Sequence, residues 1–182
     1  MTGGKPFVIG KFDRIRMAAS MAEGYATGGL GMGRYMKFEE PVGFEVLARY
    51  TRFMHDHRHL YDGATPLSDV ALVLPRQSVL NRRPDALDEF RSLGQALVER
   101  QVLLDVLLDQ RITRERLAKY PAVILPKALA LSKEQREALD AYAASGGMLL
   151  VRGDAAVMDE DGNAHSASGL TGGVTVNQST SV

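Results

Sequence analysis

The chain has 182 residues, of which 45% are hydrophobic and 24% are charged, so it is long and apolar enough to bury a core. Its 22 basic and 22 acidic side chains cancel, which disfavours binding of nucleic acid or a membrane surface by charge neutralisation. Cysteine is absent, which excludes disulfides, thiolate metal sites and cysteine nucleophiles, and no apolar run reaches the ~18 residues of a membrane-spanning helix.

The N-terminal third combines one strand pattern with two helical patterns. The apolar run at 6–9 predicts a strand, and the apolar spacing over 12–21 predicts a helix that Gly24 ends. Four glycines within 28–33 predict a flexible loop, and the apolar spacing over 44–61 predicts a second helix.

Between Asp69 and Arg152, apolar runs alternate with helical patterns. Four runs lack the polar alternation of a half-exposed strand, which is typical of strands buried in a parallel sheet: 70–74, 102–107, 122–125 and 148–151. The run at 102–107 is also compatible with a helix, because leucine is not β-branched. The regular alternation of such runs with helices predicts an α/β fold, namely a flavodoxin-like three-layer structure with a parallel sheet and helices on both faces.

Capping residues place the helices of this region. One helix is expected to begin at Pro84-Asp85, after a polar loop at 76–83. Thr113 is expected to cap a short helix. Ser132 is expected to cap a longer helix, in which Gln135 completes a capping box.

Residues 154–182 differ from the rest of the chain in composition. They carry four acidic and no basic side chains and are rich in Gly, Ser, Thr and Asn. This composition predicts a loop or tail, with a hairpin turn at Asp161-Gly162.

Three stretches carry a resemblance to a known family, namely 70–75, 117–126 and 131–154. Together they resemble the class I glutamine-amidotransferase-like domain of glycoside hydrolases, and they are similar to the trimerisation domain of family 42 β-galactosidases. Residues 159–174 resemble the next segment of that domain. Residues 1–62 resemble the end of the (β/α)8 barrel that precedes it.

The resemblance implies two parts and a structural role. Residues 1–62 would be the C-terminal βα remnant of a TIM-type barrel, and residues 69–182 a truncated amidotransferase-like domain. Because the family's catalytic carboxylates would lie on earlier barrel strands, the resemblance implies a non-catalytic structural or assembly domain of a glycoside-hydrolase-like protein of carbohydrate metabolism. Whether the chain itself is an enzyme stays open, since it has no identifiable catalytic pair.

The expected partners follow from the same resemblance. They are further copies of the chain in a homo-oligomer, or the missing barrel domain of the same protein, with carbohydrate as a candidate ligand and neither nucleic acid nor a membrane as a partner. No catalytic, cofactor-binding or metal-binding residue is assigned, and no cofactor is expected. The compartment is left open, with the cytoplasm slightly favoured because no signal segment is seen at 1–6.

Several motifs suggest a site, and each has a simpler interpretation. His55 and His59 lie four apart and would share a helical face that binds zinc, but no third ligand lies nearby in helical register. The glycines at 28–33 lack the preceding strand and following helix of a dinucleotide site. Glu39 and Glu40 would point apart in an extended loop, so they are a poor acid–nucleophile pair.

Two motifs near the C-terminus are weaker still. Asp159, Glu160, Asp161 and Asn163 lack the spacing and the terminal glutamate of a calcium loop, so a hairpin turn is favoured. The triplet at 177–179 is a formal glycosylation acceptor of a kind that arises often by chance.

Two rival functions remain beside the structural role. A flavodoxin-like module would hold a small ligand at the strand ends, but a phosphate-binding loop is missing. A metal hydrolase would be built on His55 and His59, but it lacks a third ligand. Glutamine hydrolysis by a cysteine nucleophile is excluded, because the turn after the third strand reads Pro126-Lys127-Ala128.

Overall fold

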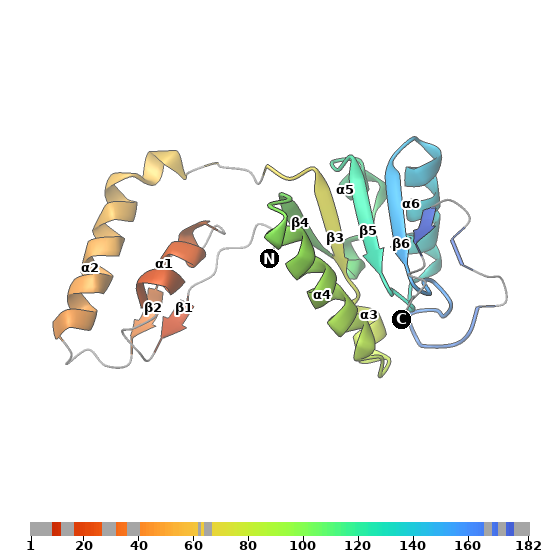
Figure 1. The fold of residues 1–182 in the computed structure, drawn as a ribbon, viewed down its shortest axis with the longest axis horizontal. Helices are drawn as coiled ribbons and strands as arrows, with labels where there is room; N and C mark the ends of the chain where they lie inside the picture. Colours follow the sequence, from red (N-terminus) through yellow and green to blue (C-terminus); the bar gives the residue numbers. More distant parts are fainter. Residues whose placement is uncertain are drawn as a thin grey trace. The chain divides into compact units, whose positions relative to one another are not determined.

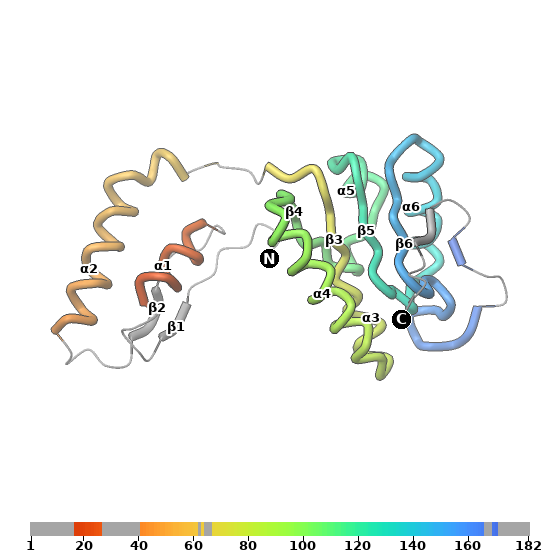
Figure 2. Tube along the Cα trace, in the orientation of Figure 1, coloured from red at the N-terminus to blue at the C-terminus, as the bar shows by residue number. Residues whose placement is uncertain are grey.

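The computed structural model describes residues 9–11, 17–26, 32–35, 41–61, 63, 67–165, 169–170 and 174–176. The chain divides into two compact units, Met1–Thr65 and Pro66–Val182, which are coloured from red to yellow and from yellow to blue in Figures 1 and 2. No helix among the described residues is both long enough and apolar enough to cross a membrane.

The first unit has a βαβα order. Its elements are β1 (Ile9–Lys11), α1 (Met17–Ala26), β2 (Met32–Tyr35) and α2 (Pro41–Asp56), followed by a 3-10 turn, η1 (Arg58–Leu60). The two strands pair in parallel as a two-stranded sheet. A short parallel strand pair joined by a helix is the repeating unit of larger α/β structures.

The structure corrects two expectations for the first unit. Gly24 does not end a helix but lies buried within α1. Residues 32 and 33 of the loop expected at 28–33 belong instead to β2, which begins at Met32, while 28–31 lie outside the described residues. A glycine weakens a helix or strand without always ending it, so these glycine signals overstated the breaks.

The core of the first unit is small. Met17 and Met21 of α1 are fully buried, and Val46, Leu47 and Tyr50 of α2 pack against them. Other large apolar side chains of α2 and η1 stay exposed: Val42, Phe44, Phe53 and Leu60. Among the described residues of this unit, the buried apolar cluster is thus confined to the contact between α1 and α2.

The second unit is built on a five-stranded parallel sheet. In chain order its strands are β3 (Val70–Leu74), β4 (Leu104–Leu108), β5 (Ala122–Pro126), β6 (Met148–Arg152) and β7 (Val174–Val176). Their order across the sheet is β4-β3-β5-β6-β7, and every neighbouring pair is parallel. This is the flavodoxin-like order 2-1-3-4-5, which confirms the predicted fold class.

Helices cover both faces of this sheet. The connection from β3 to β4 contains α3 (Arg76–Leu80) and α4 (Asp85–Glu99), and Figure 1 shows α4 on the near side of the sheet. The next two connections contain α5 (Arg114–Leu117) and α6 (Lys133–Ala144), and α6 lies on the far side. Right-handed crossovers produce this arrangement, because the chain moves to one side of β3 for β4 and to the other side for the later strands.

The main core lies between the sheet and α6. Alternate strand residues point toward this face, and their side chains are fully buried with those of α5 and α6: Ala71, Val73, Leu117, Val123, Leu125 and Leu139. The start of α6 is as expected, since the Ser132 hydroxyl accepts from the Gln135 backbone N–H and the Gln135 side chain accepts from the Ser132 backbone N–H. At the start of α5 the Thr113 hydroxyl accepts from the Arg116 backbone N–H, as expected.

Two further expectations for this unit were wrong. The polar loop expected at 76–83 contains α3, and the tail expected after residue 153 contains β7. α3 has only five residues and β7 only three, so neither has a periodicity that a sequence pattern can detect.

Two glycines follow α6, and a side chain would be unfavourable at each of them for a different physical reason. Gly146 has φ of +95°, in the left-handed region, and a side chain there would meet open space. Gly147 lies against the ring of Tyr142, so that a Cβ atom at this position would approach the ring to 2.3 Å. The Tyr142 ring is buried, and its hydroxyl donates to the Tyr120 carbonyl, so it cannot move aside without losing this bond.

The two glycines give a matched pair of variants. Gly146→Ala should lower the free energy of unfolding by about 1 kcal/mol, the usual cost of a left-handed alanine. Gly147→Ala should lower it by about 3 kcal/mol, because the methyl group displaces a buried ring. Urea denaturation measures both values, and a smaller loss for Gly147→Ala than for Gly146→Ala would contradict this explanation.

Candidate functional site

The carboxyl ends of the strands in the second unit form the first candidate site. All strands are parallel, so the segments that follow them meet at one edge, where open α/β sheets bind their ligands. Pro75 follows β3, Asp109 follows β4, Lys127 follows β5 and Gly153 follows β6. The connection that leaves β3 leads to β4 on one side of the sheet, and the connection that leaves β5 leads to β6 on the other side. The point at which the strand order reverses therefore lies between the ends of β3 and β5, at Pro75 and Lys127.

Asp109 is the buried carboxylate of this edge, and it has no exposed surface. Its two oxygens accept hydrogen bonds from the backbone N–H groups of Gln77, at 2.6 Å, and Gln110, at 2.8 Å. Its backbone carbonyl accepts from the Gln135 side chain. Burial raises the pKa of Asp109 above 3.8, against the opposing effect of these two N–H donors. The carboxylate therefore joins the start of α3 to the end of β4 and is not free to act on a ligand.

Two ion pairs attach α4 to the ends of neighbouring strands. Lys127, after β5, contacts the Asp85 carboxylate at 2.6 Å, and Arg83 contacts the same group at 3.4 Å. Arg152, at the end of β6, contacts Glu89 at 2.5 Å. The hydrogen bonds from Lys127 and Arg83 lower the pKa of Asp85 to about 2, so this carboxylate stays charged across the physiological range.

Lys127 has an unusual backbone conformation, with φ of +39°. Left-handed geometry at a residue that is not glycine costs about 1–2 kcal/mol and persists only where neighbouring contacts enforce it. The Lys127 N–H donates to the Arg152 carbonyl, and the side chain is held by Asp85. The amidotransferase reaction would require a cysteine on this turn, and here the turn presents an ion-paired ammonium group instead.

Residues 153–165, called the strap below, lie across this edge of the sheet. Backbone hydrogen bonds join the strap to the segment after β5, from Ala156 to Ala128 and from Met158 to Leu129. The Glu160 carbonyl accepts from the side chains of Gln77 and Asn81 on the other side of the edge. The residues after β5 that bond to the strap or adjoin those bonds are almost completely buried, as is Ala156 of the strap itself: Ala128, Leu129, Ala130 and Leu131.

The strap also contains the expected hairpin turn. Met158 and Ala164 form an antiparallel bridge, and Gly162 has φ of +87° at the turn. Both Asp159 oxygens accept hydrogen bonds, from the backbone N–H groups of Asp161 and Asn163 and from the Asn163 side chain. The bridge and the turn confirm the hairpin, and these bonds direct the Asp159 carboxylate into its loop.

The histidine cluster does not form the expected helical pair. α2 ends at Asp56, so His55 and His59 do not share one continuous helical face. His57 stacks on Phe53 at 4.3 Å between ring centroids, and its Nδ1 lies 2.8 Å from the Phe53 carbonyl oxygen. Among the described residues, no group of three histidine, aspartate or glutamate side chains is placed to hold a metal ion.

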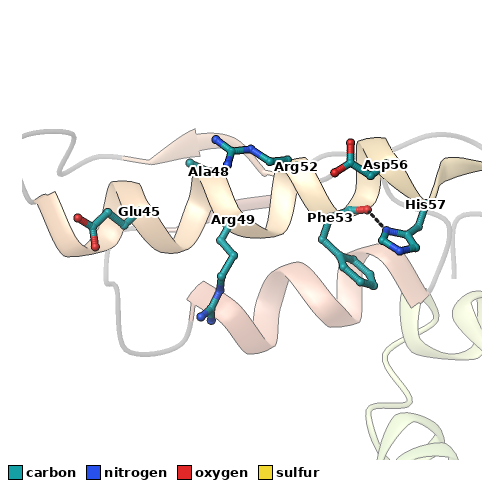
Figure 3. Close-up of a pocket in the computed structure, with 7 residues that line it drawn as sticks. All are labelled: Glu45, Ala48, Arg49, Arg52, Phe53, Asp56 and His57. Carbon is teal, nitrogen blue, oxygen red and sulfur yellow. Dashed lines mark hydrogen bonds between the residues drawn. The ribbon is translucent and has the colours of Figure 1, made fainter.

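A shallow depression lies on this part of α2 (Figure 3). Its lining comes from one helix and the turn that follows it: Glu45, Ala48, Arg49, Arg52, Phe53, Asp56 and His57. Figure 3 shows Arg52 and Asp56 on one side of the helix, and Arg49, Phe53 and His57 on the other. Because these side chains do not converge on one point, the depression has no constellation for catalysis.

The other motifs considered in the sequence lie outside the described residues. These are the glycines at 28–31, the Glu39-Glu40 pair and the triplet at 177–179. The sequence analysis assigned no role to Asp109 or Lys127 and did not predict that the strap crosses the strand ends. An aspartate directly after an apolar run was a usable signal for Asp109, since strand ends carry ligand loops in this fold.

Sequence comparison finds no matching protein family and no matching curated protein. Comparison of structures does find similar folds. The chain is similar to a β-galactosidase from Bacillus circulans sp. alkalophilus, with TM-score 0.69 and 14% identity over 88% of this chain and 29% of that one. It is also similar to Gan42B, a GH42 β-galactosidase from G. stearothermophilus, with TM-score 0.66 and 15% identity over 86% and 26%.

A third similar structure is a GH42 exo-carrageenase from Bacteroides ovatus, with TM-score 0.64 and 10% identity over 93% of this chain and 26% of that one. The chain thus spans little more than a quarter of these proteins. Since the second unit is less than two thirds of the chain, each match also extends into the first unit. At these identities the likeness defines the fold, which is that of a segment of glycoside hydrolases of this kind.

Replacing Asp109 tests its structural role. Asp109→Asn should lower the free energy of unfolding by about 1–2 kcal/mol at neutral pH, because an amide offers one acceptor oxygen to two backbone N–H groups. Asp154→Asn changes an exposed carboxylate after β6 and is the matched control, with no expected effect. Equal losses in urea denaturation of the two variants would refute the assignment.

The loss of folding stability caused by Asp109→Asn is expected to depend on pH. Because burial raises the pKa of Asp109 in the folded chain, its contribution to stability is full below pH 3.8 and is lost as the pH rises through the folded-state pKa. The asparagine does not titrate, so the loss caused by Asp109→Asn should be larger below pH 3.8 than at neutral pH. A loss that grows with pH would show the opposite sign and contradict the burial argument.

The contribution of Asp85 to stability should depend on pH in the opposite sense to that of Asp109. Its pKa is lowered to about 2 in the folded chain, so its stabilisation is present above pH 3.8 and is lost as the pH falls toward 2. The effect should stay below about 1 kcal/mol, because the side chain is 42% exposed and water screens the pair. Asp85→Asn should flatten this part of an acid-unfolding curve, whereas Asp88→Asn, on the same helix, should not.

Proposed function

We propose that this chain is a non-catalytic structural and assembly segment of a glycoside-hydrolase-like protein. In this proposal the second unit is an amidotransferase-like domain related to the trimerisation domain of GH42 β-galactosidases. The first unit is the end of the β/α barrel that precedes this domain. The larger protein would act in carbohydrate metabolism, and its catalytic carboxylates would lie on barrel strands that the printed sequence does not contain.

One observation carries the non-catalytic role, namely that the ligand edge of the parallel sheet is used for internal contacts. The buried carboxylate of Asp109 is bonded to two backbone N–H groups, and Lys127 and Arg152 are paired with carboxylates of α4. The strap then covers the segment that follows β5. An enzyme needs a nucleophile or an acid–base pair that a substrate can reach, and the groups at this edge are committed to each other.

The barrel assignment is supported by the topology of the first unit. Two parallel strands, each followed by a helix, have the topology that two consecutive repeats of a (β/α)8 barrel would have. Exposed apolar side chains on α2, such as Phe44 and Phe53, would be covered in part by the neighbouring repeats. The structural matches to GH42 enzymes, which extend into this unit, agree with this assignment.

The two rival functions have less support. A flavodoxin-like binding module would use the edge of the sheet that the strap covers. A metal hydrolase built on His55 and His59 would need both side chains on one helical face, and α2 ends between them. The assembly role requires neither feature.

Turnover assays test the proposal directly. The chain alone should release no p-nitrophenol from p-nitrophenyl β-galactoside beyond the uncatalysed rate, because it has no accessible acid–nucleophile pair. Turnover that copurifies with the chain, and that disappears in Asp109→Asn or in His55→Ala, would refute the non-catalytic role.

The barrel assignment has its own test in the natural gene. We expect the coding sequence upstream to supply the earlier β/α repeats, including two strand-end carboxylates. The extended protein should hydrolyse a glycoside, and alanine at either of those carboxylates should abolish the activity. An upstream sequence without β/α repeats would overturn the assignment.

A further inference from the structure

We draw no further inference here: the strongest candidate, the apolar patch of the exposed Met148 and the half-buried Leu150 on the face of β6 opposite the main core, carries nothing, because nothing among the described residues shows what covers it.

Discussion

Every strand of the second unit runs in the same direction, and this constraint decides most of its structure. A parallel neighbour can be reached only through a crossover, and the crossovers place α4 on one face of the sheet and α6 on the other. The same constraint brings the ends of β3, β4, β5 and β6 to one edge. Polar groups at such an edge either bind a ligand or satisfy one another, because buried polar groups without partners are costly.

In this protein the groups at that edge satisfy one another. Asp109 bonds the start of α3, Lys127 and Arg152 bond carboxylates of α4, and the strap covers what remains. The arrangement fixes α3 and α4 to the sheet and pairs these polar groups of the strand ends with one another. The same fold binds cofactors or substrates in other proteins, so what this edge does depends on its side chains and not on the fold.

The sequence predicted best those elements that are specified by a few neighbouring residues, such as an apolar run or a capping box. The four apolar runs became β3, β4, β5 and β6 within one or two residues, and the Ser132–Gln135 capping box lies at the start of α6 as expected. The missed elements are short, since α3 has five residues and β7 three, too few for a detectable periodicity. α3 is also held by a distant contact, because Asp109, which binds the Gln77 N–H, lies 32 residues further along the chain. Gly24 shows that a glycine can lie inside a helix as well as at its end. In the candidate site, the hairpin turn at Asp161-Gly162 was predicted, but the position of the strap across the strand ends and the pairing of Lys127 with Asp85 were not.

By itself the sequence determined the fold class, the parallel direction of the strands, the absence of cysteine chemistry and the positions of the main helices. Each of these follows from periodicity, capping or composition, which act over a few neighbouring residues. Only the tertiary structure decided that β4 lies at the edge of the sheet, that Lys127 pairs with Asp85, and that the strap crosses the strand ends. These depend on which segments meet in space, and short-range patterns carry no information about such encounters.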